Sequence, residues 1–242
     1  DVIQISGAEG GTGASPLSSI KYAGAPWELG IAETQQVLVA NGLRGRVTLR
    51  TDGGMKTGRD VIVAAMLGAE QYGFGTAAMI AVGCKMARQC HLNTCPVGVA
   101  TQREDLREKY FGTPEMLITF LRRVGAEVRE ILAELGYEKI DDIIGRSDLL
   151  QQIPGAADHR WGSVDLSKLI AHIDPDGTQP HKATQDRNDR PGTPLDDEII
   201  EDLETSIVAR TPAQRSYPIR NTDRTVGGRL SGHIARRYGD AG

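Results

Sequence analysis

All three cysteines of the chain lie in one short segment, residues 84–102, which reads "CKMARQCHLNTCPVGVATQ". Cys84, Cys90 and Cys95 are separated by five and then four residues. Asn, Thr and Pro residues around them break regular structure, so we expect a loop on which the three thiolates converge. Three soft sulfur ligands suit an iron–sulfur cluster with three irons, or a four-iron cluster with one non-protein ligand.

Two other interpretations of this segment stay open at the level of the residues. His91 would complete a Cys3His zinc site, although the adjacent side chains of Cys90 and His91 point in divergent directions. The three cysteines would alternatively be buried structural residues. Their clustering, and Pro96 directly after the last of them, favour the iron–sulfur cluster, because cluster motifs commonly end in Cys-Pro.

Two glycine-rich loops form a second candidate site. The segments "TDGGMKTGRD" and "GFGTA" each follow a strand-like run and precede a helical pattern. Backbone N–H groups near Gly53, Gly54, Gly73 and Gly75 are therefore expected to converge on an anion, with a helix N-terminus beside each loop. Glycines at strand ends also merely permit tight turns, which is the alternative for either loop alone. Two such loops in consecutive units favour a phosphorylated cofactor.

A third loop, "ISGAEGGTGASP", follows the first strand-like run. Its glycines would let the backbone approach a planar ring or a substrate closely. The loop lacks the G-x-G-x-x-G spacing, and no acidic residue closes a following strand, so a nicotinamide site is not expected. Glu9 and Lys21 flank the loop and are candidate catalytic residues that bind a carboxylate or transfer a proton; the alternative is that both are solvated surface residues.

The elements that position these loops alternate along the first 110 residues. The runs "DVIQIS", "RVTLRTD" and "EQYGFG" are typical of strands, and helical patterns cover residues 28–40 and 60–67. This β-α-β-α-β order predicts an α/β fold with parallel strands and crossover helices.

The clearest helix is expected between an N-cap at Thr113 and a stop at Gly136, with Pro114 at its first position. One broad apolar stripe predicts that the helix packs against other elements. The stripe consists of Met116, Leu117, Phe120, Leu121, Val124, Val128, Ile131, Leu132 and Leu135.

Composition then changes along the chain. After Ile173 the sequence becomes polar and rich in proline, glycine and aspartate, which indicates an exposed linker. We therefore expect a first domain over residues 1–173, a linker over 174–215, and the start of another domain over 216–242. Because Asp1 leads directly into a strand-like run, the chain is expected to be a piece of a longer protein.

The overall composition excludes several classes of protein. The chain has 242 residues, 39% of them hydrophobic, and a net charge of −4. A chain of this length can bury a hydrophobic core, and its negative net charge does not indicate nucleic-acid binding. No apolar run approaches the roughly 20 residues of a membrane span. We expect a cytoplasmic protein, and in that compartment clustered cysteines more often bind metal than form disulfides.

Four segments resemble the large subunit of the glutamate synthase family. They read "ISGAEGGTGASPLSSIKYAGAPWELG", "DGGMKTGRDV", "GFGTAAMIAVGCKMARQCHLNTCPVGVATQ" and "NTDRTVGGRLSGHIARRYG". The resemblance runs through residues 1–135 and resumes after residue 215, and the segments occur in the order of the family.

The resemblance implies the end of a (β/α)8 TIM barrel, about three βα units, that holds FMN and a 3Fe–4S cluster. A helical or irregular connection and the truncated start of a right-handed parallel β-helix domain would follow. By this resemblance Cys84, Cys90 and Cys95 match the cluster ligands. The FMN loops are matched by Gly53, Gly54, Gly73, Gly75 and Thr76 at the phosphate, and by Gly10 and Gly11 in the "GGTGAS" loop beside the flavin and 2-oxoglutarate.

The activity that the resemblance implies is reductive transfer of ammonia from glutamine to 2-oxoglutarate, with hydride from reduced FMN and electrons through the cluster. Electrons would come from an NADPH-oxidising small subunit or from ferredoxin, and the remainder of the synthase chain would be a partner. Two alternatives are a stand-alone FMN-dependent TIM-barrel oxidoreductase, for example one acting on 2-hydroxy acids, and an inactive truncated fragment. The first shares the "DGG" loop with the family but lacks the cysteines. The second follows from the absence of the glutaminase domain, the first five barrel strands and most of the β-helix.

Overall fold

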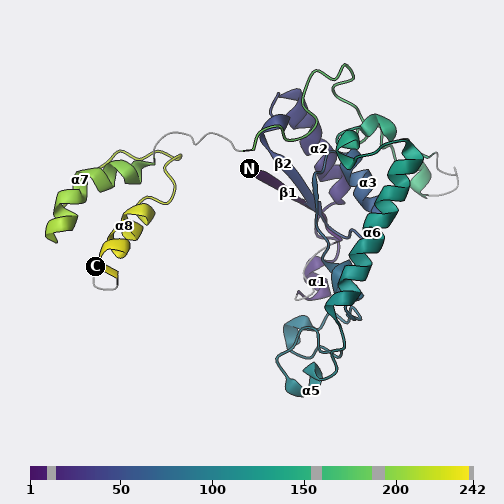
Figure 1. Cartoon of the computed structure of the whole chain (residues 1–242), viewed down its shortest axis with the longest axis horizontal. Helices are drawn as coiled ribbons and strands as arrows, with labels where there is room; N and C mark the ends of the chain where they lie inside the picture. Colours follow the sequence, from purple (N-terminus) through teal and green to yellow (C-terminus); the bar gives the residue numbers. More distant parts are fainter. Residues whose placement is uncertain (10–14, 154–159, 187–193, 240–242) are drawn as a thin grey trace. The chain divides into compact units, whose positions relative to one another are not determined.

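A computed structural model describes residues 1–9, 15–153, 160–186 and 194–239 of the chain (Figure 1). The chain divides into two compact units, Asp1–Asn188 and Asp189–Gly242. Each unit has its own secondary structure, and the residues singled out in the sequence all belong to the first. Among the described helices, none combines the length and the apolar character needed to cross a membrane.

The first unit contains a three-stranded parallel sheet in the order β1 (Val2–Ser6), β2 (Thr48–Asp52), β3 (Gln71–Tyr72). Gln4 pairs with Arg50, and Arg50 pairs with Gln71. The expected α/β class and parallel strands are confirmed. The sheet is consistent with part of a TIM barrel, which remains a proposal.

Two crossover helices cover one face of the sheet. They are α2 (Trp27–Ala40) and α3 (Gly58–Met66), close to the two helices expected from the sequence. Ile31 of α2 and Leu49 of β2 are fully buried between them, together with Ala64 of α3. On the opposite face Val2, Gln4 and Ser6 of β1 and Arg50 of β2 are exposed.

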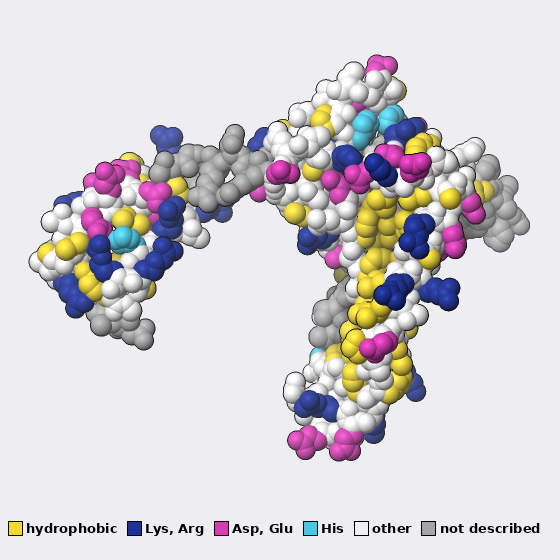
Figure 2. Space-filling view, viewed as in Figure 1, with side chains coloured by type: hydrophobic (Ala, Val, Ile, Leu, Met, Phe, Trp, Pro, Cys, Tyr) yellow, Lys and Arg dark blue, Asp and Glu magenta, His cyan; other side chains and the backbone are white. Residues whose placement is uncertain are grey.

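The long helix α6 (Pro114–Leu135) begins after Thr113 and ends at Gly136, which has a positive φ of 80°. The predicted boundaries are therefore confirmed. Val124 and Leu132 are buried, and Leu132 joins Ile62 and Met66 of α3 in a second core cluster. Met116, Leu121 and Leu135 of the predicted stripe stay exposed, and Figure 2 shows hydrophobic side chains gathered along this helix.

Short helices connect these elements in the first unit. They are α1 (Leu17–Ile20), η1 (Arg44–Arg46), α4 (Thr76–Ala81), η2 (Cys90–Leu92), α5 (Glu104–Arg107), η3 (Ile140–Ile143), η4 (Ser147–Leu149) and η5 (Arg160–Ser163).

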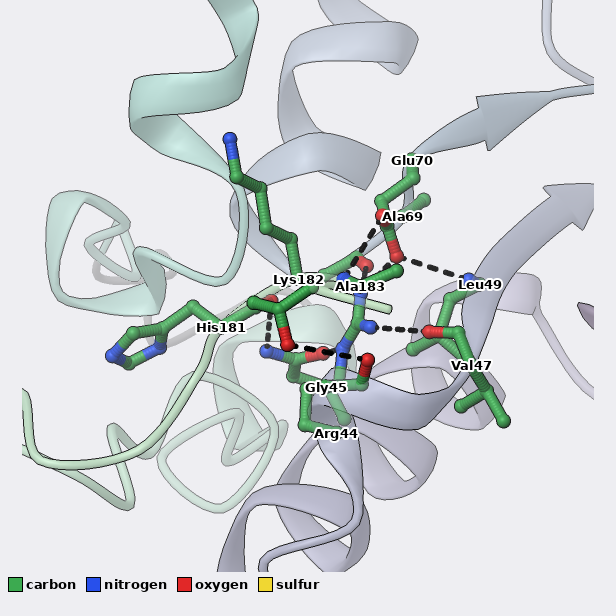
Figure 3. Close-up of polar contacts among 12 residues, drawn as sticks. Arg44, Gly45, Val47, Leu49, Ala69, Glu70, His181, Lys182 and Ala183 are labelled. Carbon is green, nitrogen blue, oxygen red and sulfur yellow. Dashed lines mark hydrogen bonds and ion pairs between the residues drawn. The ribbon is translucent and has the colours of Figure 1, made fainter. Parts of the chain in front are cut away.

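Residues 174–186 belong to the first unit, although their composition predicted a linker. Figure 3 shows His181, Lys182 and Ala183 of this segment beside Arg44 and Glu70. The fully buried Arg44 forms an ion pair of 2.5 Å with Glu70, and the second carboxylate oxygen of Glu70 accepts the Ala183 N–H at 3.1 Å. Thr184 N donates to the Gly45 carbonyl at 2.9 Å. The boundary therefore follows Asn188 and not Ile173, because the backbone of this polar segment is bonded to buried groups of the sheet unit.

The second unit consists of α7 (Leu195–Ala209) and α8 (Gly228–Tyr238). Asp196 of α7 is buried, and its carboxylate accepts the N–H groups of Gly227 at 2.7 Å and of Arg229 at 2.6 Å. This contact pins the start of α8 to α7. Helix α7 lies within residues 174–215, which were predicted as a linker, and the β-helix expected after residue 216 remains a prediction.

Candidate functional site

The carboxyl ends of the three strands bring three loops together at one edge of the sheet. Gly7 N donates to the Asp52 carbonyl at 2.9 Å, and Gly73 N donates to the Thr51 carbonyl at 2.8 Å. A Cβ on Gly53 would lie 2.5 Å from Gly7 Cα. The loops after β1, β2 and β3 are thus in direct contact or bonded through the sheet, as the parallel order requires.

The glycines of these loops differ in what they contribute. Gly53 and Gly54 have positive φ angles of 116° and 94°, which side chains other than glycine rarely adopt. Gly73 uses its N–H in the sheet and is therefore not a free donor. Gly75 has an ordinary φ of −103°, and no described atom lies within 4 Å of where its Cβ would be. The space above Gly75 is therefore open, as a cradle for a bound group requires.

The N-terminus of α3 is already occupied, which corrects the expectation of an anion site beside this loop. Asp60 accepts the N–H groups of Lys56 at 2.8 Å and Thr57 at 2.9 Å, within a capping box with the Thr57 hydroxyl. Glu127 of α6 accepts the Gly58 N–H at 2.7 Å. Two carboxylates at this helix end would repel a phosphate, so any anion must be held by the glycine loops themselves.

Glu127 was not singled out in the sequence, because it lies 69 residues from Gly58 and belongs to a helix recognised by its apolar stripe. No local pattern reports such a distant partner. The capping box of Thr57 and Asp60 was the only sequence signal that the α3 terminus satisfies itself.

The second glycine loop leads directly into α4, whose first residue is Thr76. Among the described residues, no side chain caps this helix. The ring of Phe74, between Gly73 and Gly75, packs edge-to-face on Phe120 of α6, with the centroids 6.4 Å apart. The loop is therefore fixed from the α6 side, while the space at Gly75 stays free.

The two candidate catalytic residues lie at different places in the first loop region. Glu9 is exposed and lies against the first glycine loop, since a Cβ on Gly54 would be 2.8 Å from Glu9 Cβ. The ammonium of Lys21 lies 5.0 Å from the ring centroid of the exposed Tyr22. Within the described residues no hydrogen bond or ion pair joins Glu9 to Lys21. The predicted cofactor residues Gly10 and Gly11 lie outside the described residues.

The cysteine segment forms the loop that its composition predicted. Met86, Arg88 and Asn93 have left-handed backbone conformations, and only three residues, Cys90–Leu92, form a 3-10 turn. The Asn93 side chain accepts hydrogen bonds from Thr101 Oγ1 at 2.8 Å and from Gln102 N at 2.7 Å. These bonds close the part of the segment that contains Cys95.

Cys95 has the environment of a thiolate. It is 6% exposed, and burial by itself would raise the pKa of its thiol. Hydrogen bonds from backbone N–H groups outweigh this effect and hold the pKa below its ordinary value. The donors are Ala100, Val97, Val99 and Gly98. A sulfur that receives several N–H donors is suited to carry negative charge and to bind a metal.

Cys84 and Cys90 are half-buried, and all three cysteines are free. The Cys84 sulfur accepts the Met86 N–H at 3.4 Å. Within the described ranges, no three His, Cys, Asp or Glu side chains are placed to hold one metal ion. The structure therefore does not bring Cys84, Cys90 and Cys95 together at one ion, with or without His91, and the convergence of the three thiols stays a prediction. A cluster takes one thiolate per iron, so its ligands lie farther apart than those of a single ion, and the donor set of three thiols fits it.

Comparisons with known proteins identify relatives across the chain. A family profile described as "Conserved region in glutamate synthase" matches residues 1–138. The glutamate synthase (NADPH) large chain of Azospirillum brasilense is 50% identical over 239 residues, 99% of this chain. The ferredoxin-dependent glutamate synthase 2 proteins of Arabidopsis thaliana (chloroplastic) and Synechocystis sp. are each 52% identical, over 249 and 248 residues, and cover 100% of it.

The coverage of the relatives themselves is small. The chain spans only 15–16% of the length of these curated relatives.

Proposed function

The chain belongs to the glutamate synthase family, and from this premise we propose that it forms the flavin-binding and cluster-binding part of an enzyme that makes L-glutamate from 2-oxoglutarate. The nitrogen would be ammonia released from glutamine. Condensation of ammonia with the 2-oxo group releases water, and a hydride and a proton then reduce the resulting C=N bond. The observation that carries the proposal is that only the short helix α4 separates the cysteine loop from the second glycine loop, within the residues matched by the family.

The glycine loops are proposed to hold the phosphate of FMN. Gly53 and Gly54 have positive φ angles and place backbone that carries no side chain at the strand edge. Gly75, beside Thr76, faces free space. The self-capped N-terminus of α3 is excluded from this role by Asp60 and Glu127. The polar backbone of the loops after β2 and β3, and not the terminus of α3, supports phosphate binding.

The cysteine loop is proposed to bind a 3Fe–4S cluster through Cys84, Cys90 and Cys95. The depressed pKa of Cys95 supports this, because the thiolate and not the thiol is the ligand. When bound, the flavin would supply hydride chemistry and the cluster would supply single electrons.

The residues of the first loop are proposed to act on the substrate. Glu9 lies beside Gly54 at the strand edge, where a carboxylate can hold or move a proton. Lys21 remains a candidate for binding a substrate carboxylate. Gly10 and Gly11 remain proposed flavin neighbours.

The larger assembly is also a proposal. The open face of the β1–β3 sheet supports a TIM barrel that further strands complete, because parallel strands are normally covered on both faces. The named relatives include NADPH-dependent and ferredoxin-dependent enzymes, so an NADPH-oxidising subunit and ferredoxin are both proposed electron donors. A cytoplasmic location stays a prediction, and some relatives are named as chloroplastic.

The test uses the full-length protein that contains these residues, with chemically reduced methyl viologen as electron donor. Glutamate should accumulate only when 2-oxoglutarate, glutamine and reductant are all present. A Cys95→Ser variant should retain flavin but lose viologen-driven turnover. Oxidation of a 2-hydroxy acid without any glutamate formation would contradict the proposal and favour a stand-alone flavin oxidoreductase.

A further inference from the structure

Helix α6 contacts the end of the first glycine loop through a single carboxylate. Glu127 Oε2 accepts the Gly58 N–H at 2.7 Å. Gly58 lies three residues after Met55, which is buried in the core. The backbones are in close contact here, since a Cβ on Gly58 would lie 2.7 Å from Val128 N. The start of α3, and with it the exit of the Gly53–Gly54 loop, is therefore set by α6.

The same helix contacts the second glycine loop one to two turns earlier. Phe120 meets the ring of Phe74 at 78° between the ring planes, which is the favourable edge-to-face arrangement. Because Phe74 lies between Gly73 and Gly75, this contact fixes the second loop on the same support.

The cysteine loop is joined to α6 at its base. Gly83, directly before Cys84, has a φ of 99°, and a Cβ there would lie 2.9 Å from Phe111 Cζ. Phe111 is two residues before Thr113, the N-cap of α6. The start of the cysteine loop therefore lies next to the residues that lead into the first turn of this helix.

We propose that α6 is the common support that fixes the two glycine loops relative to the cysteine loop, and that Glu127 is its positioning residue for the flavin phosphate. The inference rests on the proposed function, because it assigns the loops to a flavin. Glu127 contacts no part of the proposed ligand; it acts through Gly58 and the start of α3. Its carboxylate holds the exit of a loop whose two glycines have positive φ angles.

The experiment compares three single variants of the full-length holoenzyme. Glu127→Ala removes the acceptor, Glu127→Gln keeps an amide oxygen that accepts the Gly58 N–H, and Glu130→Ala is the matched control. Glu130 lies on the same helix, is exposed, and has no hydrogen bond or ion pair within the described ranges. The readouts are the dissociation constant of FMN, the electron paramagnetic resonance signal of the cluster, and thermal unfolding.

We expect Glu127→Ala to raise the FMN dissociation constant by about three- to tenfold, because the exit of the Gly53–Gly54 loop loses the hydrogen bond that holds it. The cluster signal and cooperative unfolding should persist, and Glu127→Gln should bind FMN nearly as the wild type does. This rescue distinguishes a positioning hydrogen bond from a general contribution to stability.

Three outcomes would overturn the inference. They are equal FMN binding in Glu127→Ala and Glu130→Ala, an equal defect in Glu127→Gln and Glu127→Ala, and loss of cooperative unfolding together with the flavin. A wild-type holoenzyme that contains no flavin would overturn the proposed function as well. Failure of the inference alone is recognised by a wild-type holoenzyme that binds flavin together with any one of these three outcomes.

Discussion

At the scale of single residues, Gly54 and Gly75 of the two glycine loops have different roles. Gly54 satisfies a backbone conformation, with a φ of 94°, and a side chain there would contact Glu9 Cβ at 2.8 Å. Gly75 has an ordinary φ and open space around it. A substitution at Gly75 therefore tests ligand binding separately from folding, whereas a substitution at Gly54 does not.

We predict that Gly75→Val abolishes FMN retention in the full-length protein while its melting temperature changes little. The β-branched side chain fills the space in which we place the phosphate, without straining the chain. Gly54→Val should lower both flavin content and stability, since valine disfavours a positive φ. Flavin absorbance after gel filtration, with scanning calorimetry, measures both. Gly125→Val on α6, another position with open space, is the control; flavin content unchanged in Gly75→Val would show that the phosphate lies elsewhere.

His181 predicts a pH dependence of stability in the first unit. Its ring stacks on His172 at 5.4 Å between centroids, and burial, followed by the nearby charges of His172 and Arg146, lowers the pKa of His181 below its ordinary value. Asp174 and Asp148 oppose the shift. Because the folded state disfavours the protonated ring, the stabilising contribution is present above about pH 6.5, the ordinary histidine value, and declines as the pH falls below it.

Chemical denaturation at a series of pH values from about 8 to about 5 measures how the free energy of unfolding depends on pH. This range of about three pH units spans the ordinary pKa of histidine. A His181→Gln variant should lose much of the slope between roughly pH 6.5 and pH 5. The aspartates titrate lower, since the pKa values of Asp148 and Asp174 are also depressed, and they contribute below that window. An identical slope in wild type and variant would exclude His181 as its source.

At the scale of elements, the sequence predicted most of what is local. The period of the strands, the Thr113 and Pro114 start of α6 and its Gly136 stop all appear as expected, because these signals act within a few residues. The contacts that hold the elements together were not predictable in this way. Gly58 with Glu127, and Glu70 with Ala183, join residues far apart in the sequence.

The segment that follows Ile173 shows the limit most clearly. Its proline, glycine and aspartate content predicted a linker, yet Glu70 bonds the N–H of Ala183 and Gln35 bonds the carbonyl of His181 at 3.0 Å. Composition reports the side chains of a segment and not the partners of its backbone. Of the candidate site, the glycine and cysteine positions were found from sequence, whereas the occupied terminus of α3 was not.

We predict that Arg44→Met lowers the free energy of unfolding by about 3–5 kcal/mol, because it leaves the Glu70 carboxylate without its buried partner. Arg44 is fully buried and also donates to the Val47 carbonyl at 2.7 Å. Lys182→Met removes the exposed ion pair with Asp141 and should cost less than about 1 kcal/mol. Urea denaturation of the full-length protein compares the two, and equal effects would contradict a structural role for the buried pair.

At the scale of the whole molecule, the main feature is the exposed apolar surface of the first unit. β1 has one open edge and an exposed face, with Val2 at 50% exposure, and α6 leaves part of its stripe uncovered, including Leu121 at 43%. A closed barrel has no such edges. We infer that this surface is covered by further strands and helices of the synthase domain.

We therefore predict that these 242 residues, expressed alone, aggregate or form a partly molten state, bind FMN weakly and make no glutamate. Co-expression with the first five strands of a family member's barrel should restore solubility and flavin binding. Light scattering, calorimetry and flavin absorbance measure the outcome. A monodisperse, cooperatively melting, yellow protein from these residues alone would refute the argument from the open sheet.

The central claim is that one loop carries a three-thiolate cluster beside a flavin site, and anaerobic iron and sulfide reconstitution of the full-length protein tests it most directly. Electron paramagnetic resonance of the oxidised protein should show a three-iron cluster, with iron and sulfide bound in the ratio of 3Fe–4S. The signal should be lost when Cys84, Cys90 or Cys95 is replaced by serine, whereas FMN is retained. A protein that takes up only zinc, or iron without sulfide, would contradict the account.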